Sequence, residues 1–144
     1  MSYIRIWVHC VWTTKRRIPY MEDHIRSAVI KHISENAKQK GIHIDHINGY
    51  HEHLHSLISL GGRQTISEIM QNLKGESSYW INKSKLTMHK FEWQDDYYAV
   101  SIGMDHLEIL RAYIRNQVNH HRKESIDNEI DRLIEEYKLE RFRD

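Results

Sequence analysis

The period at which hydrophobic residues recur changes several times along the chain, and each change predicts a new element of secondary structure. Over 3–13 the apolar residues occupy every second position, from Ile4 to Trp12, which is typical of a strand with one buried face. From about 23 to 40 they recur at helical spacing, and Gly41 follows as the residue expected to end that helix. The same criteria predict strands at 42–48, 53–60 and 98–102, a helix that begins after Thr65 and contains Ile81, and helices at about 105–122 and about 126–138.

Local signals mark several of the predicted boundaries. Thr65 with Glu68 three residues later forms a capping-box pattern, in which the threonine side chain begins a helix. Asp105 and Glu108 repeat this spacing before the next predicted helix. Gly49 is expected to begin the turn after the second strand.

The order of the predicted elements is β-α-β-β-α-β, followed by two further helices. This order matches the ferredoxin-like split βαβ arrangement, an α+β fold with an antiparallel sheet. No internal repeat or linker-like stretch interrupts the chain, so we expect residues 1–144 to form one domain.

Composition narrows the possible classes of protein. The chain is 40% hydrophobic and 28% charged, which is typical of a globular protein, and no apolar run approaches the length of a membrane span. The net charge of +1 implies that any phosphate-binding surface is local. Cys10 is the one cysteine and falls in an apolar strand pattern, which predicts a reduced core thiol in a cytoplasmic protein.

Among the twelve histidines, His53 and His55 stand at a spacing that suits metal binding. Side chains alternate along a strand, so both rings project from one face while Leu54 projects from the other. Two imidazoles side by side on a rigid sheet are a ready pair of metal ligands, and we expect them to line a cleft. The alternative is a pair of half-exposed strand histidines that bind nothing, since the pattern is short and frequent.

Tyr113 and Gln117 lie four residues apart in the helix predicted near 105–122, so their side chains are neighbours at the flank of its apolar stripe. A tyrosine hydroxyl can act as a nucleophile once it is activated. The amide oxygen of Gln117 suits a hard divalent cation. The alternative is a tyrosine that packs at a helix flank beside a solvated glutamine.

Taken together, these motifs carry a family resemblance that extends over nearly the whole chain. His53-Leu54-His55 resembles the His-hydrophobic-His signature of HUH nucleases, and Tyr113-Ile114-Arg115-Asn116-Gln117 with His120-His121 resembles the nucleophile helix of the single-tyrosine, IS200-like transposases of bacterial insertion sequences. The stretches 14–17, 72–78 and 91–94 are similar to segments of that family as well. Glu52 departs from the aspartate common before the first histidine, and 95–98 lacks the usual glycine.

The resemblance implies a single HUH transposase domain that cuts and rejoins single-stranded DNA with hairpin ends. His53, His55 and Gln117 would hold Mg²⁺ or Mn²⁺, although imidazole ligands also suit zinc. Tyr113 would attack the scissile phosphate and form a 5′-phosphotyrosine with a free 3′-hydroxyl. No nucleotide cofactor is needed, which agrees with the lack of a Walker-type glycine loop. The family is dimeric, and the sequence leaves open whether Tyr113 serves its own or the partner's histidine pair.

Basic and aromatic residues are candidates for DNA contacts. Lys15, Arg16, Arg17 and Lys74 could grip phosphates, with a solvated surface run as the alternative for the first three. Aromatic residues of the segment 93–98 could stack on unpaired bases, although Trp93 is expected to pack in the core.

Two other functions are compatible with this sequence. A domesticated relative that processes repeated palindromic DNA in the host chromosome would need the same residues. A ferredoxin-like nucleic-acid binder with incidental histidines would need none of the chemistry.

Overall fold

Four antiparallel strands form one sheet, in the order β2-β3-β1-β4, in a computed structural model that describes residues 1–142. The strands are β1 (Ile6–Thr13), β2 (His43–Tyr50), β3 (His53–Leu60) and β4 (Tyr98–Ile102). The helices are α1 (Asp23–Gln39), α2 (Ile66–Lys83), α3 (Leu107–Arg115), α4 (Gln117–His121) and α5 (Ile126–Tyr137), with short 3₁₀ turns at Lys15–Arg17 and Met104–His106. The predicted α+β fold, the order of the elements along the chain and the antiparallel sheet are confirmed.

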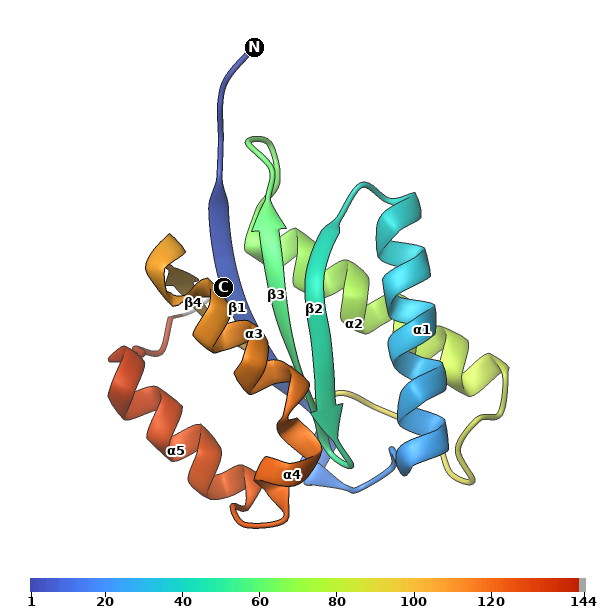
Figure 1. The fold of residues 1–144 in the computed structure, drawn as a ribbon. Coiled ribbons are helices and arrows are strands. Elements are labelled where there is room, and N and C mark those ends of the chain that lie inside the picture. Colours follow the sequence, from blue (N-terminus) through green and yellow to red (C-terminus); the bar gives the residue numbers. More distant parts are fainter. Residues whose placement is uncertain (143–144) are drawn as a thin grey trace.

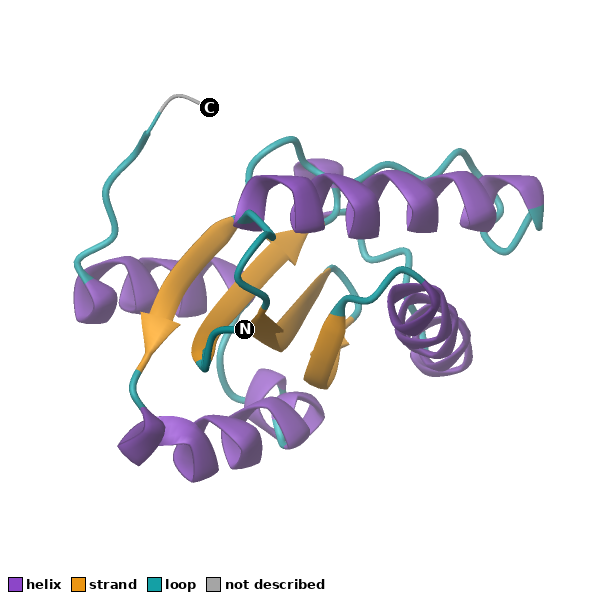
Figure 2. Ribbon diagram, turned by 90° about the horizontal axis from the view of Figure 1, so that it is seen from above, coloured by secondary structure: helices purple, strands orange, loops and turns teal. Residues whose placement is uncertain are grey.

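Helices cover both faces of this sheet. Helices α1 and α2 lie on one face, and α3, α4 and α5 lie on the other (Figures 1 and 2). The α1–α2 face holds the largest apolar cluster, with Val8, Cys10 and Trp12 from β1 and Leu54 and Ile58 from β3. None of the helices among the described residues is long and apolar enough to cross a membrane.

The opposite face carries two smaller apolar clusters with polar side chains between them. One cluster joins Trp7 and Leu57 of the sheet to Leu110 and Ile114 of α3. The other joins Val11 of β1 to Ile126, Ile130 and Leu133 of α5. These two clusters anchor α3 and α5 on either side of the polar side chains described below.

The first strand is shorter and more buried than its alternation predicts. It begins at Ile6, and the side chains of Ile4 and Ile6 remain 47% and 42% exposed. From Trp7 to Thr13 every residue is buried, because helices cover both faces, so the expectation of a half-buried strand was wrong.

Gly49 lies inside β2 instead of beginning the turn after it. A Cβ atom added to Gly49 would collide with the carbonyl oxygen of His53. The glycine therefore permits a close approach of β2 to β3 at the start of the strand that carries the histidine pair.

The predicted helix at about 105–122 is interrupted at Asn116, whose φ of −96° and ψ of 16° depart from helical values. The helix before the break is α3 and the one after it is α4. Thr65 caps α2 as predicted, accepting a hydrogen bond from the backbone N–H of Glu68. The analogous prediction for Asp105 was wrong, because α3 starts at Leu107 without a side-chain cap.

Candidate active site

The two histidines of β3 face α3, α4 and α5, and both are fully buried. Alternation along the strand was predicted correctly, since Leu54 lies in the apolar cluster on the other face. The expectation that the rings line an open cleft was wrong. Gln117 of α4 and Glu129 of α5 pack directly against them, with hydrogen bonds to His53 and His55.

Partners outside the pair fix the orientation of both rings. The Nδ1 atom of His53 lies 2.8 Å from Oε1 of Glu52, and Nδ1 of His55 lies 2.9 Å from Nε2 of His9 on β1. Each ring therefore turns its Nε2 atom toward the space between the sheet and the helices. Such partners orient metal-binding imidazoles in proteins. Glu52, a departure from the aspartate that the family resemblance predicts, still reaches His53.

Tyr113 and Gln117 reach the same space from α3 and α4 of the same chain. Oε1 of Gln117 lies 2.9 Å from Nε2 of His53, and the Tyr113 ring meets the His55 ring edge-on at 5.6 Å between centroids. The structure thus brings together all four residues singled out from sequence spacing, even though the helix breaks between the last two. One chain holds the complete set.

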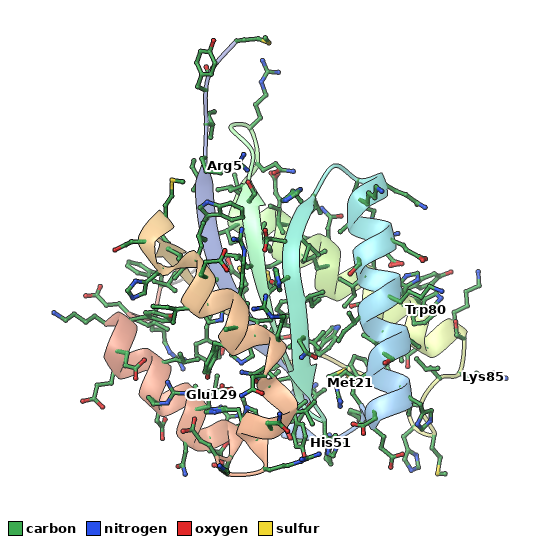
Figure 3. All side chains as sticks on the ribbon, in the orientation of Figure 1. Arg5, Met21, His51, Trp80, Lys85 and Glu129 are labelled. Atoms are coloured by element: carbon green, nitrogen blue, oxygen red, sulfur yellow. The ribbon has the colours of Figure 1, made fainter. Side chains whose placement is uncertain are left out.

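Glu129, which the sequence analysis did not single out, is fully buried at the centre of this group. Its Oε1 atom lies 3.0 Å from Nε2 of His55 and 2.9 Å from Nε2 of His121, and its Oε2 atom accepts a hydrogen bond from the hydroxyl of Tyr113. Figure 3 shows Glu129 on α5, beside α3 and α4. The sequence does contain a sign that Glu129 is buried. Glu129 stands three residues after Ile126 and four before Leu133, which places a charged residue on the apolar face of an amphipathic helix.

Burial and neighbouring charges set the protonation of these groups. Burial lowers the pKa of His55 to about 4, against the pull of Glu129. Burial would raise the pKa of Glu129, but hydrogen bonds from His121 and His55 hold it well below its usual range. Burial and the charge of Glu129 raise the pKa of Tyr113 above its usual value. Tyr113 is therefore a neutral phenol beside an ionised carboxylate.

A guanidinium also reaches the tyrosine. Nη2 of Arg132, on α5, donates to the Tyr113 oxygen at 2.9 Å and to Glu124 at 3.2 Å. Positive charge at this position would stabilise a phenolate at Tyr113.

The residues present fit a divalent cation. One ligand atom from each of His53, His55, His121 and Glu129 lies within 4.8 Å of the others. Imidazole nitrogen and carboxylate oxygen are common ligands of divalent metals.

Three of the four basic residues predicted to bind DNA have partners for their side chains in the protein. Lys15 pairs with Glu92 at 3.1 Å, and Arg17 pairs with Asp127 of α5. The Nζ atom of Lys74 donates to the backbone carbonyls of Asp95 and Asp96, at 2.7 and 3.2 Å. Arg16 is exposed and adopts a left-handed backbone conformation with φ of 55°.

The aromatic candidates divide between core and groove. Trp93 is buried, and its ring N–H donates to Ser77, so the expected packing role agrees with the structure. Tyr97 lines a groove of about 640 Å³ together with Lys15 and Lys74. Tyr98 packs against the α5 cluster.

Residues 2–117 match the family model described as "Transposase IS200 like". The chain belongs to this family. No curated protein matches the sequence. A structure assigned as a transposase from Deinococcus radiodurans is 19% identical, with a TM-score of 0.65, and the match covers 81% of this chain and 93% of that one. The REP-associated tyrosine transposase bound to a REP hairpin is 17% identical, with a TM-score of 0.62, and covers 84% and 72%. Both solved structures support the fold of this transposase. Helix α5 lies beyond residues 2–117, the part of the chain that the family model matches.

Proposed function

We propose that this IS200-like transposase cuts and rejoins single-stranded DNA through a covalent bond between DNA and Tyr113. The observation that carries the proposal is the cluster of Tyr113, Gln117 and the His53–His55 pair within one chain. A tyrosine beside a potential metal site supplies a nucleophile and a Lewis acid, which together suit attack on a phosphodiester.

In the proposed cleavage step, the Tyr113 oxygen attacks the scissile phosphorus and the bond to the 3′ oxygen breaks. The Tyr113 hydroxyl donates its hydrogen bond to Oε2 of Glu129, and this carboxylate would receive the proton as the bond to phosphorus forms and pass it on to water. The products are a 5′-phosphotyrosine and a 3′-hydroxyl, which takes its proton from water. Arg132 stabilises negative charge on the tyrosine oxygen as the proton leaves.

A divalent ion, Mg²⁺ or Mn²⁺, would be held by His53, His55 and Gln117 and would polarise the scissile phosphate as a Lewis acid. Glu52 and His9 keep the Nε2 atoms of the two histidines directed at that position. Rejoining reverses the cleavage step, because a 3′-hydroxyl attacks the phosphotyrosine and releases Tyr113. Bond energy is conserved throughout, so no nucleotide cofactor is required.

The proposed substrate is single-stranded DNA with a hairpin. The REP-associated transposase with a similar fold is bound to a REP hairpin, which supports a hairpin substrate for this chain. The same likeness favours a second candidate, a domesticated enzyme that processes palindromic repeats of the host chromosome. Both candidates use the same residues. The exposed side of the 15–17 turn and the groove beside Lys74 are proposed DNA contacts.

The family resemblance also supports a homodimer. The two edges of the sheet are β2 and β4, and either could join a second copy. A dimer built in this way leaves each chain with its own tyrosine and histidine pair.

The decisive experiment is capture of the covalent intermediate. Wild-type protein with Mn²⁺ and a labelled hairpin oligonucleotide should give a protein–DNA adduct on denaturing gels, and Tyr113→Phe should give none while retaining DNA binding. Tyr98→Phe is the matched control and should form the adduct. Adducts that persist in Tyr113→Phe would overturn the proposed nucleophile.

A further inference from the structure

Three imidazole rings converge on a single carboxylate oxygen in the candidate active site. Oε1 of Glu129 lies 3.0 Å from Nε2 of His55, 2.9 Å from Nε2 of His121 and 3.3 Å from Nε2 of His53. All four side chains are almost completely excluded from solvent. Without a cation, this one oxygen would face three nitrogens that must each supply a proton.

Both ring nitrogens of His53 face oxygen atoms. Its Nδ1 atom faces a carboxylate oxygen of Glu52, while its Nε2 atom faces Oε1 of Gln117 as well as Glu129. A neutral imidazole carries one N–H donor, so it cannot satisfy acceptors at both nitrogens. If Nδ1 donates to Glu52, the lone pair of Nε2 points at other oxygen lone pairs, a conflict that a cation at this point removes.

We propose that His121 and Glu129 complete the metal site, so that the ion is bound by three imidazole nitrogens and one carboxylate oxygen. The ligand atoms of His53, His55, His121 and Glu129 lie within 4.8 Å of one another. This inference deepens the proposed function and rests on it. It adds two ligands to the pair on β3, both from residues beyond the part of the chain that matches the family model.

The donor set specifies the class of metal. Imidazole nitrogens suit Zn²⁺ best, and the harder Mn²⁺ still accepts them more readily than Mg²⁺, which prefers oxygen ligands and retains its waters. Three nitrogens and one carboxylate therefore select Zn²⁺ or Mn²⁺ over Mg²⁺. The amide oxygen of Gln117 stays available as a further ligand, and its amide nitrogen donates to Oε2 of Glu129 at 3.3 Å.

Glu129 also links the site to the nucleophile. Its Oε1 atom faces the three imidazoles while its Oε2 atom accepts the hydrogen bond of Tyr113. Helix α5 is held on the sheet by the apolar contacts of Ile126, Ile130 and Leu133 with Val11. The C-terminal helix thus contributes directly to the site and does more than cover it.

Metal binding measured without DNA tests this proposal independently of cleavage. Chelator-treated protein would be titrated with Zn²⁺, Mn²⁺ or Mg²⁺ by calorimetry, with the thermal unfolding temperature followed in parallel. The wild type should bind one Zn²⁺ or Mn²⁺ per chain and become more stable, with a much weaker response to Mg²⁺. Glu129→Gln and His121→Asn should each weaken binding by roughly tenfold or more, since even outer partners of ligands have effects of that size.

The control is Glu135→Gln, which removes the same charge from an exposed position of α5 and should bind metal like the wild type. Wild-type affinity in both Glu129→Gln and His121→Asn, with binding lost in His53→Asn, would overturn the larger ligand set. A stronger response to Mg²⁺ than to Mn²⁺ would also overturn it. If Glu129→Gln does not fold, His121→Asn alone decides. Adduct formation at Tyr113 is measured in a separate assay. Failure of the proposed ligand set would therefore be distinguishable from failure of the proposed function.

Discussion

The two faces of the sheet are buried to a similar extent but are built from different chemistry. On the α1–α2 face, β1 and β3 contribute Cys10, Trp12 and Leu54, all of them fully buried among apolar neighbours. On the opposite face the same two strands contribute His9, His53 and His55, also buried. Burial alone therefore does not tell a structural face from a functional one.

The faces differ in how their side chains are stabilised. The apolar face gains from removal of hydrocarbon from water, so each residue contributes largely on its own. On the polar face, each buried group depends on a partner, as His55 does on His9 and Glu129. Loss of one member leaves the others unsatisfied, which makes substitutions on that face strongly coupled.

The largest stability effect is expected on the polar face. His55→Ala removes a hydrogen-bond partner of the buried Glu129 carboxylate. Leaving a buried charged group without a partner costs more than the roughly 1–3 kcal/mol of a neutral one, and the deleted ring leaves a cavity as well. Urea unfolding of metal-free protein should show this loss, and the variant should form no covalent adduct. If His55→Ala is as stable as the wild type, the polar face does not form the closed network seen here.

A substitution on the apolar face should separate stability from metal chemistry. Leu54→Ala deletes a fully buried side chain next to the histidine pair and should cost roughly 2–5 kcal/mol. Its metal affinity should stay near the wild-type value at a temperature where it is folded, because no ligand is altered. Calorimetric titration checks this, and a large loss of affinity would mean that the faces are not independent.

A milder effect is expected from the partner that orients His53. Glu52→Gln keeps the size of the side chain but replaces the acceptor 2.8 Å from Nδ1, and comparable changes weaken metal binding by roughly 10–100-fold. Calorimetry with Mn²⁺ measures the change. Glu22→Gln, at the exposed start of α1, is the control with unchanged affinity. Wild-type affinity in Glu52→Gln would show that the hydrogen bond does not orient the ring.

The apolar face is the part of the molecule that the sequence predicts best. Alternation along β1 and β3 identifies Cys10 and Leu54 as core residues because a period of two is a local property of a strand. Burial of the opposite face could not be foreseen in this way. It depends on α3–α5 folding back over the sheet, and local periodicity carries no information on where a later helix docks.

The residues of the candidate site also differ in whether local sequence patterns could predict them. Spacing within one strand or helix brought out His53, His55, Tyr113 and Gln117, and the structure brings these residues together. Glu129 joins them only through tertiary packing, 74 residues from its partner His55. The break at Asn116 was missed as well, because no proline or glycine marks it.

Mixing two inactive variants of this protein is expected to restore no activity. In the structure the polar face is complete within one chain, with Tyr113 beside the histidine pair of the same chain. Tyr113→Phe and a His53→Ala, His55→Ala double variant should therefore each be inactive, and a differently tagged pair of the two should stay inactive when co-expressed and purified together. A tyrosine that served the partner's histidines would restore one intact site in each mixed dimer, since one chain would supply the hydroxyl and the other the metal ligands. Adduct formation on a hairpin oligonucleotide by the mixed sample, with circular dichroism to verify that both variants are folded, measures the difference. Adducts above the background of the separate variants would show that the active site is shared between chains and would contradict the arrangement seen here, while leaving Tyr113 as the nucleophile.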